Sequence, residues 1–94
     1  MGRFDTTAFN NCLSNAEGGC VESQYKLGLM YATGHGVGQD NVLAHMWFNI
    51  ATIHGGERAK EDRKELALDM SQTEIAEAQR LARERITLEP SLVS

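Results

Sequence analysis

The ten residues YATGHGVGQD, numbered 31–40, place glycines at every second position between two segments whose apolar residues have helical spacing. Downstream, the apolar residues follow the i, i+3, i+4, i+7 template of one helix face: Ala44, Trp47, Phe48 and Ala51. Upstream, residues 21–33 place Leu27, Met30 and Tyr31 on one stripe. We therefore predict a helix, a glycine-rich turn and a second helix, which restrict the fold to packed helical hairpins.

Local end signals set the borders of the predicted helices. Asp40 is a natural N-cap because its carboxylate accepts hydrogen bonds from free backbone N–H groups, and Gly55-Gly56 is a natural stop. Ser71 and Glu74 have the S-x-x-E spacing of a capping box. Strand signals are scarce. The sequence therefore predicts an all-α chain of about five antiparallel helices, in residues 5–16, 21–33, 40–55, 57–70 and 71–86.

The glycines raise two separate expectations. Dinucleotide-binding loops follow a strand, and phosphate-binding P-loops need Gly-Lys-Ser/Thr. The GHGVG run follows a predicted helix, has no lysine and lacks the G-x-G-x-x-G spacing, so we expect a turn and no bound nucleotide. Inside the preceding helix, Gly28 costs about 1 kcal/mol relative to alanine. Its presence predicts that another backbone, in the helix that carries Trp47, comes close.

Composition narrows the classes of partner. The chain of 94 residues has 13 acidic and 9 basic residues, a formal charge of -4, and no long apolar run. A nucleic-acid partner is not expected, because phosphate binding needs a concentrated positive surface, and neither is a membrane span. No signal peptide is visible, so we expect a cytoplasmic protein if the chain is complete, and a periplasmic or secreted one remains open if it is a fragment.

Histidine and cysteine spacings give no catalytic or metal site. His35, His45 and His54 lie ten and nine residues apart, so no two share a helix face at i, i+3 or i+4. We expect these histidines to face solvent or to cap helices. Cys12 and Cys20 match no zinc signature, and we expect two reduced thiols that pack as small apolar residues, with a disulfide as the open alternative. No cofactor or metal is predicted.

A weak internal repeat leads to a family resemblance. A shift of 37 residues pairs Lys26 with Arg63 and Leu29 with Leu66, and periods of this size are typical of helical-hairpin solenoids. Residues 16–55 resemble a Sel-one-like repeat, a relative of the tetratricopeptide repeat (TPR). The residues that carry the resemblance are Gln24, Tyr25, Leu27, Gly28, Met30, Tyr31, Gly34, Gly36, Val37, Asp40, Ala44, Trp47, Phe48, Ala51 and Gly55.

The resemblance implies a TPR-like solenoid in one domain. We expect this single helical repeat domain to cover residues 1–88, with one complete repeat at about 16–55, partial repeats on each side and C-terminal capping helices at about 56–88. Residues 89–94 are expected to form a flexible tail. Cysteine-rich members of the family bridge cysteines eight residues apart, but the position of Cys20 relative to Leu27 does not fit that bridge.

For function, the resemblance implies a non-catalytic scaffold or adaptor that binds a protein or peptide partner, in bacteria often in envelope, stress or host-contact processes. The first helix of each hairpin lines the concave face, which makes Gln24, Tyr25, Lys26 and Met30 the candidate contact residues. The open ends of the solenoid also allow a homo-oligomer. The alternative is a hydrolase related to cysteine-rich β-lactam-binding relatives, although the chain lacks a Ser-x-x-Lys pair.

Overall fold

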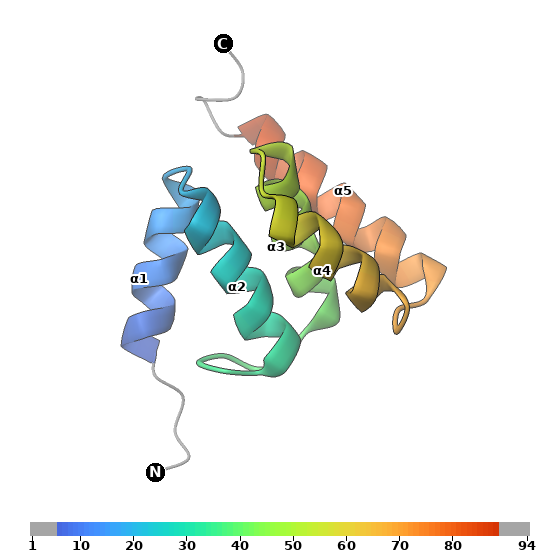
Figure 1. Cartoon of the computed structure of the whole chain (residues 1–94), viewed down its shortest axis with the longest axis horizontal. Helices are drawn as coiled ribbons and strands as arrows, with labels where there is room; N and C mark the ends of the chain where they lie inside the picture. The colour runs from blue at the N-terminus through green and yellow to red at the C-terminus, as the bar shows by residue number, and fades with distance from the viewer. Residues whose placement is uncertain (1–5, 89–94) are drawn as a thin grey trace.

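Five α-helices joined by short turns make up residues 6–88, the part of the chain that the computed structural model describes (Figure 1). The helices are α1 (Thr6–Glu17), α2 (Val21–Thr33), α3 (Asn41–Ile53), α4 (Glu57–Ala67) and α5 (Gln72–Leu88). Consecutive helices run in opposite directions, which confirms the predicted all-α arrangement of antiparallel hairpins. The tail predicted at residues 89–94 lies outside the described residues.

Helix ends form where the sequence signals place them. Asp40 Oδ1 accepts a hydrogen bond of 3.0 Å from the Leu43 backbone N–H and so caps α3. At the start of α5, Glu74 N–H donates to Ser71 Oγ at 3.1 Å, and Ser71 N–H donates to Glu74 Oε1 at 2.9 Å. These contacts satisfy backbone donors that a helix N-terminus leaves without partners. Both predicted caps are confirmed.

The predicted glycine turn connects α2 to α3. Gly34 follows the last residue of α2 at φ 78°, and its N–H donates to the Met30 carbonyl at 2.8 Å. Gly36 has φ 81°, also in the left-handed region that glycine adopts without a steric penalty. The Asp40 N–H then donates to the Tyr31 carbonyl at 2.9 Å, so the two ends of the turn are tied together. The turn contains no strand–helix junction of the kind that binds phosphate.

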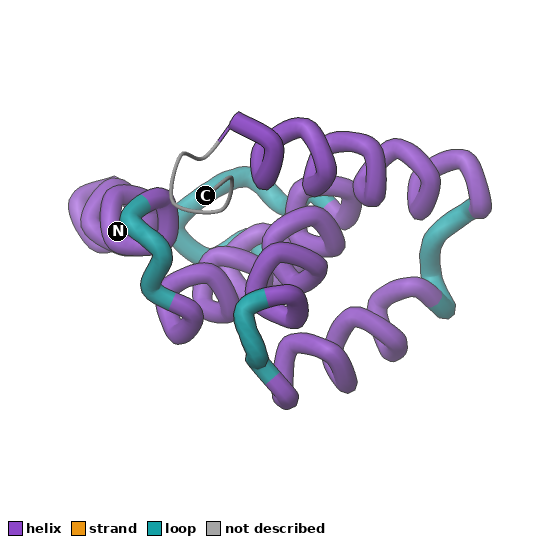
Figure 2. Tube along the Cα trace, turned by 90° about the horizontal axis from the view of Figure 1, so that it is seen from above, coloured by secondary structure: helices purple, strands orange, loops and turns teal. Residues whose placement is uncertain are grey.

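Helix α3 lies at the centre of the fold. Every residue from Ala44 to Ala51 is buried, as expected for a helix that is apolar on most of its surface. It packs against α2, α4 and α5. Figure 2 shows that α4 and α5 separate from each other after leaving their connecting turn. Each of these two helices therefore packs mainly on α3.

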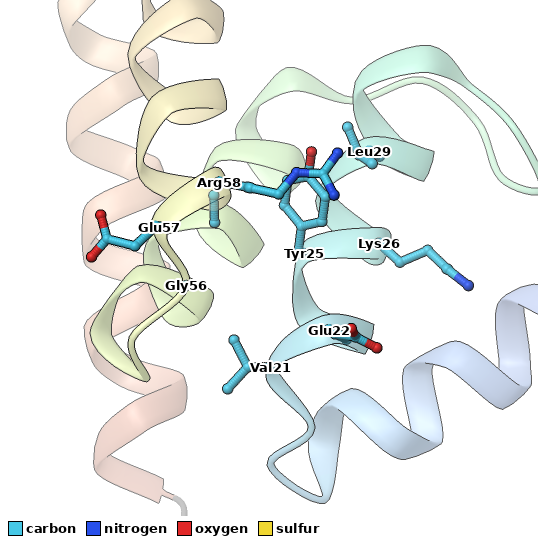
Figure 3. Close-up of a pocket in the computed structure, with 9 residues that line it drawn as sticks. Val21, Glu22, Tyr25, Lys26, Leu29, Gly56, Glu57 and Arg58 are labelled. Carbon is cyan, nitrogen blue, oxygen red and sulfur yellow. The ribbon is translucent and has the colours of Figure 1, made fainter.

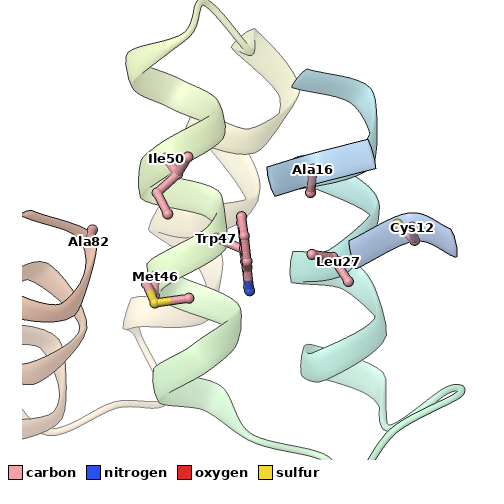
Figure 4. Packing of buried hydrophobic residues seen from close by; sticks show 7 residues of the cluster. All are labelled: Cys12, Ala16, Leu27, Met46, Trp47, Ile50 and Ala82. Carbon is pink, nitrogen blue, oxygen red and sulfur yellow. The ribbon is translucent and has the colours of Figure 1, made fainter. Parts of the chain in front are cut away.

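The main core surrounds the indole of Trp47, which is 2% exposed. Figure 4 shows this side chain extending from α3 toward Leu27 on α2 and Ala16 on α1. On the other side of α3, Met46 and Ile50 complete the cluster with Ala82 of α5. The buried parts of four helices thus meet in one cluster, and burial of large apolar side chains of this kind contributes about 1.5 to 3 kcal/mol each.

A second cluster connects α2, α3 and α4 through Phe48, and it corrects the prediction for Gly28. A β-carbon at position 28 would overlap the phenyl ring of Phe48. The helix that carries Trp47 is the neighbour of Gly28, as predicted, but its nearest atoms belong to the Phe48 ring and not to the backbone. Ala51 and Ala59 complete the cluster, so Phe48 connects the repeat hairpin to α4.

Candidate functional site

A groove runs along the surface between α2 and α4, the first helices of two successive hairpins. Its first hollow, of about 450 Å³, is lined by Val21, Tyr25 and Leu29 of α2 and by Gly56, Arg58 and Ala59 at the start of α4. Its second hollow, of about 410 Å³, is lined by Leu29, Phe48, Glu61, Asp62, Glu65, Leu66 and Asp69, among others. Leu29 belongs to both hollows, and we call the combined surface the α2–α4 groove.

Helical spacing determines which side chains reach the α2–α4 groove. On α2, Val21, Tyr25 and Leu29 recur every four residues, so they form one stripe along the helix. On α4, Asp62 and Leu66 have the same spacing. The groove is therefore a surface made by two helix faces that lie side by side, and both faces come from helices with charged outer surfaces.

Tyr25 connects the two walls of the groove. Its hydroxyl donates a hydrogen bond of 2.6 Å to Asp62 Oδ2, and the Arg58 guanidinium lies 5.1 Å from the centre of its ring. Figure 3 shows Arg58 reaching from α4 across to this ring, while Lys26 and Glu57 point away from it on the two sides. The hydrogen bond to the Asp62 carboxylate, together with burial, raises the pKa of Tyr25 above its ordinary value of 10.0. Tyr25 therefore stays neutral and keeps its donated proton at physiological pH.

The structure divides the four predicted contact residues into two pairs. Tyr25 and Lys26 line the α2–α4 groove. Met30 is half-buried and packs on the main core. Gln24 is fully buried at 0% exposure, so its predicted place on a partner-facing surface is wrong.

The physical reason for the burial of Gln24 is a set of polar partners inside the fold. Its side-chain Nε2 donates to the Ala16 carbonyl at 3.1 Å, and its Oε1 accepts from His54 Nδ1 at 2.9 Å. A buried amide is tolerated when its polar atoms are paired in this way. Gln24 therefore joins α1, α2 and the end of α3.

The histidines differ from the expectation that all three face solvent or cap helices. His35 is exposed, and His54 follows the last residue of α3, where its N–H donates to α3 carbonyl groups. His45, in contrast, is buried at 3% exposure and contacts Asn49. Burial, reinforced by the positive charge of Arg63, lowers the pKa of His45 below its ordinary value of 6.5.

The two cysteines also lie in different environments. Cys12 is buried, as predicted, and its thiol donates to the Ser23 carbonyl at 3.2 Å. Burial raises the pKa of Cys12. Cys20 is exposed, so the prediction that it packs in the core is wrong, and hydrogen bonds with Ser23 lower the pKa of its thiol. Both are free thiols in this structure, and no hydrogen bond between residues 6 and 88 joins either one to a histidine.

Two further observations concern metals and membranes. Within the described range, no group of three or more His, Cys, Asp or Glu side chains is arranged to hold a metal ion. None of the five helices, as far as the structure describes them, is long and apolar enough to cross a membrane.

The α4 wall of the groove is the part of the site that sequence reasoning missed. The charged run from Glu57 to Glu65 has the sequence pattern of a solvated helix face, whereas Arg58 and Asp62 both contact Tyr25. A signal for this contact is present in the sequence. Asp62 follows Tyr25 by 37 residues, the same offset that reveals the internal repeat.

Comparison with known proteins agrees with this geometry. Residues 21–55, which contain α2, the glycine turn and α3, match the family model of the Sel1 repeat. No curated protein and no solved structure gives a significant match. The match of residues 21–55 to the Sel1 repeat thus confirms the resemblance seen in the sequence, and the five described helices have the antiparallel hairpin arrangement of a helical-repeat solenoid.

Proposed function

From the Sel1 repeat at residues 21–55, we propose that the chain is a non-catalytic adaptor that binds a protein or peptide partner in the α2–α4 groove. Sel1 repeats are helical repeats that generally mediate protein interactions. In stacked helical hairpins, the first helices lie next to one another and present an extended surface to partners. Here those helices are α2 and α4.

The observation that carries the proposal is the groove itself. It combines apolar side chains, such as Leu29 and Leu66, with charged groups and a tyrosine at its middle. Binding surfaces commonly have this composition, an apolar centre with a polar rim and aromatic or arginine side chains that anchor the partner. Tyr25 and Lys26 are the proposed contacts on α2, and Arg58 is the proposed contact on α4.

The proposed domain organisation follows from the same stacking. The complete repeat covers about 16–55, and α4 and α5 act as the C-terminal cap within a domain that extends to residue 88. The hydrolase alternative gains no support from the comparisons. The competing proposal is self-association through the open ends of the solenoid. The apolar side chain of Leu68, which follows the last residue of α4, is 84% exposed.

The test is selection of binders from a displayed library of random peptides, followed by affinity measurements on variants. Arg58→Ala should weaken the selected peptides about tenfold, because it removes one proposed anchor without touching the core. Lys60→Ala is the matched control, since Lys60 is an exposed cation of α4 outside the groove. Equal melting temperatures for both variants would show that the loss concerns binding alone.

Two results would count against the proposal. Peptides that bind both variants equally well would place the binding surface elsewhere. A library that yields no specific binder, together with sedimentation that shows a dimer at micromolar concentration, would favour self-association as the role of this surface.

A further inference from the structure

The net charge of the chain is concentrated in the α2–α4 groove. Of the 13 acidic and 9 basic residues in the sequence, six acidic and two basic residues line the two hollows. The remaining seven acidic and seven basic residues balance one another. The formal charge of -4 is thus the charge of this one surface, and a surface with such an excess attracts groups of opposite charge.

The excess of negative charge lies at one end of the α2–α4 groove. Lys26 and Arg58 line the first hollow, where they offset its two carboxylates. The second hollow contains four carboxylates and no basic side chain. Among residues 6–88, no ion pair neutralises the three of them that are exposed, Glu61, Glu65 and Asp69. The lining of the second hollow therefore carries an excess of negative charge.

Apolar side chains form a continuous floor beneath these charges. Val21 and Leu29 floor the first hollow, and Leu29, Phe48 and Leu66 continue into the second. Helix α4 has 11 residues, which at 1.5 Å per residue gives a length of about 16 Å. An extended segment of about five residues covers that distance. The groove is thus long enough for a short peptide segment that holds an apolar residue and several charged ones.

We propose that the occupant of the α2–α4 groove is a basic segment of a partner protein, with an apolar side chain in the hollow beside Tyr25 and lysine or arginine side chains on the Glu61–Asp69 end. This inference rests on the proposed function and specifies its partner. The apolar side chain gains affinity by leaving water. The basic side chains gain affinity and association rate from the unpaired carboxylates, and they determine the direction of the segment.

Other occupants fit the surface less well. Nucleic acids and acidic peptides would bring negative charge against four carboxylates. A second copy of the chain carries the same formal charge of -4, so two copies repel each other at this surface unless a basic region of one meets the groove of the other. A basic peptide segment is the partner that satisfies both the charge and the apolar floor.

The experiment uses the whole chain and the same displayed library of random peptides. We expect the selected sequences to combine one large apolar residue with two or more lysines or arginines, and their affinity to fall as salt is raised from about 0.05 to 0.5 M. The double variant E61K/E65K should bind a synthetic copy of a selected peptide at least about tenfold more weakly. A peptide whose basic residues are changed to glutamate should regain binding to E61K/E65K.

The matched control is E77K/E84K, which reverses two exposed glutamates on α5, outside the groove. Unchanged peptide binding by this control would show that the loss in E61K/E65K depends on where the charges lie and not on the total charge of the chain. Peptides that depend on Arg58 but lack basic residues, or that bind E61K/E65K normally, would overturn the basic-segment inference while leaving the adaptor function intact. A library without any groove binder would overturn the proposed function itself. A dimer that E61K/E65K dissociates would assign the groove to a second copy.

Discussion

The two helix pairs of this chain are held together in different ways. Helices α2 and α3 pack directly on each other, with Gly28 admitting the ring of Phe48. Helices α4 and α5 are also consecutive and antiparallel, yet each packs on α3 and the two separate from one another. The first pair contains the residues that match the Sel1 repeat, whereas each helix of the second pair packs mainly on α3.

The difference shows how a short solenoid can support a charged outer helix. Of the 11 residues of α4, only Ala59 is buried, and polar contacts fix the helix in place. Tyr25 bonds to Asp62 on one side, and Arg63 Nη1 donates to Asn49 Oδ1 at 2.6 Å on the other. The apolar hairpin provides the core, and α4 provides the charged wall of the groove. Five measurements, from the largest expected effect to the smallest, test this division.

Loss of Trp47 should have the largest effect. Trp47→Ala removes the side chain on which four helices pack, together with the surface that supports Arg85, whose guanidinium lies 4.7 Å from the indole centre. We expect a loss of about 3 to 5 kcal/mol in the free energy of unfolding, measured by urea denaturation. Leu66→Ala on α4 is the control and should cost much less, since Leu66 is only half-buried. Equal losses would contradict the division between hairpin and wall.

A valine at position 28 tests the direct packing of α2 on α3. Gly28→Val places methyl groups where the Phe48 ring lies and should destabilise the chain by about 2 to 3 kcal/mol. Phe48→Leu frees space, so the double variant should lose less than the sum of the single losses. Additive losses in this double-mutant cycle would show that the two residues do not share the contact.

Arg63→Met tests the polar attachment of α4. It keeps an unbranched apolar stem but removes the guanidinium that donates a hydrogen bond to Asn49, a side chain that is 7% exposed. An amide oxygen left without its partner should cost about 1 to 2 kcal/mol. Chemical denaturation gives this value, and circular dichroism checks that the helix content stays the same. An unchanged stability would mean that the Arg63–Asn49 hydrogen bond does not hold α4 and that its other contacts, such as the Tyr25–Asp62 hydrogen bond, are sufficient.

Loss of each of the two helix caps should lower the free energy of unfolding by a small and different amount. Asp40→Ala removes the cap of α3, the central helix, and should cost about 1 kcal/mol. Ser71→Ala removes the exposed cap of α5 and should cost less, about 0.5 kcal/mol. Thermal denaturation of both variants at equal protein concentration measures the difference, and a larger loss for Ser71→Ala would reverse the assigned importance of the two helices.

Acid should weaken the attachment of α4 to α3 through His45. Because the pKa of His45 is lowered in the folded chain, the unfolded chain takes up a proton first as the pH falls below 6.5. The full stability is therefore present above pH 6.5 and declines below it until the folded-state pKa is reached. At pH 6 this loss is at most about 0.8 kcal/mol. Urea titrations at pH 7.5, 6.5 and 6 measure this decline in the free energy of unfolding, and His45→Gln should remove the part that comes from His45. An unaltered decline in the variant would assign the pH dependence to other groups.

Local chemistry made much of the fold predictable. The borders of α2, the Asp40 cap and the Ser71–Glu74 capping box each depend on residues within a few positions of one another. The all-α class follows from apolar spacing that repeats every three or four residues. The Sel1 resemblance then supplied the stacking of hairpins, which local patterns alone do not determine.

The remaining features depend on contacts between distant residues. Gln24 is polar and lies on the first helix of the repeat, and its burial depends on His54, 30 residues away. The burial of His45 depends on how α3 is surrounded by its neighbours. The acidic groove was missed because a run of charges on one helix has the same pattern whether it faces open water or a neighbouring helix. Tyr25 and Lys26 line the groove, and their contact with a partner stays a prediction.

The separate support of α4 and α5 on α3 has a consequence for local opening. Either helix can detach without the other, whereas α3 is exposed only when the whole core opens. Amide hydrogens of α3 should therefore exchange with solvent last. A segment bound across α2 and α4 stabilises the attached form of α4, so it should slow exchange along α4 and leave α5 as it was. If the proposed adaptor function holds, the groove couples binding of a partner to the retention of one helix.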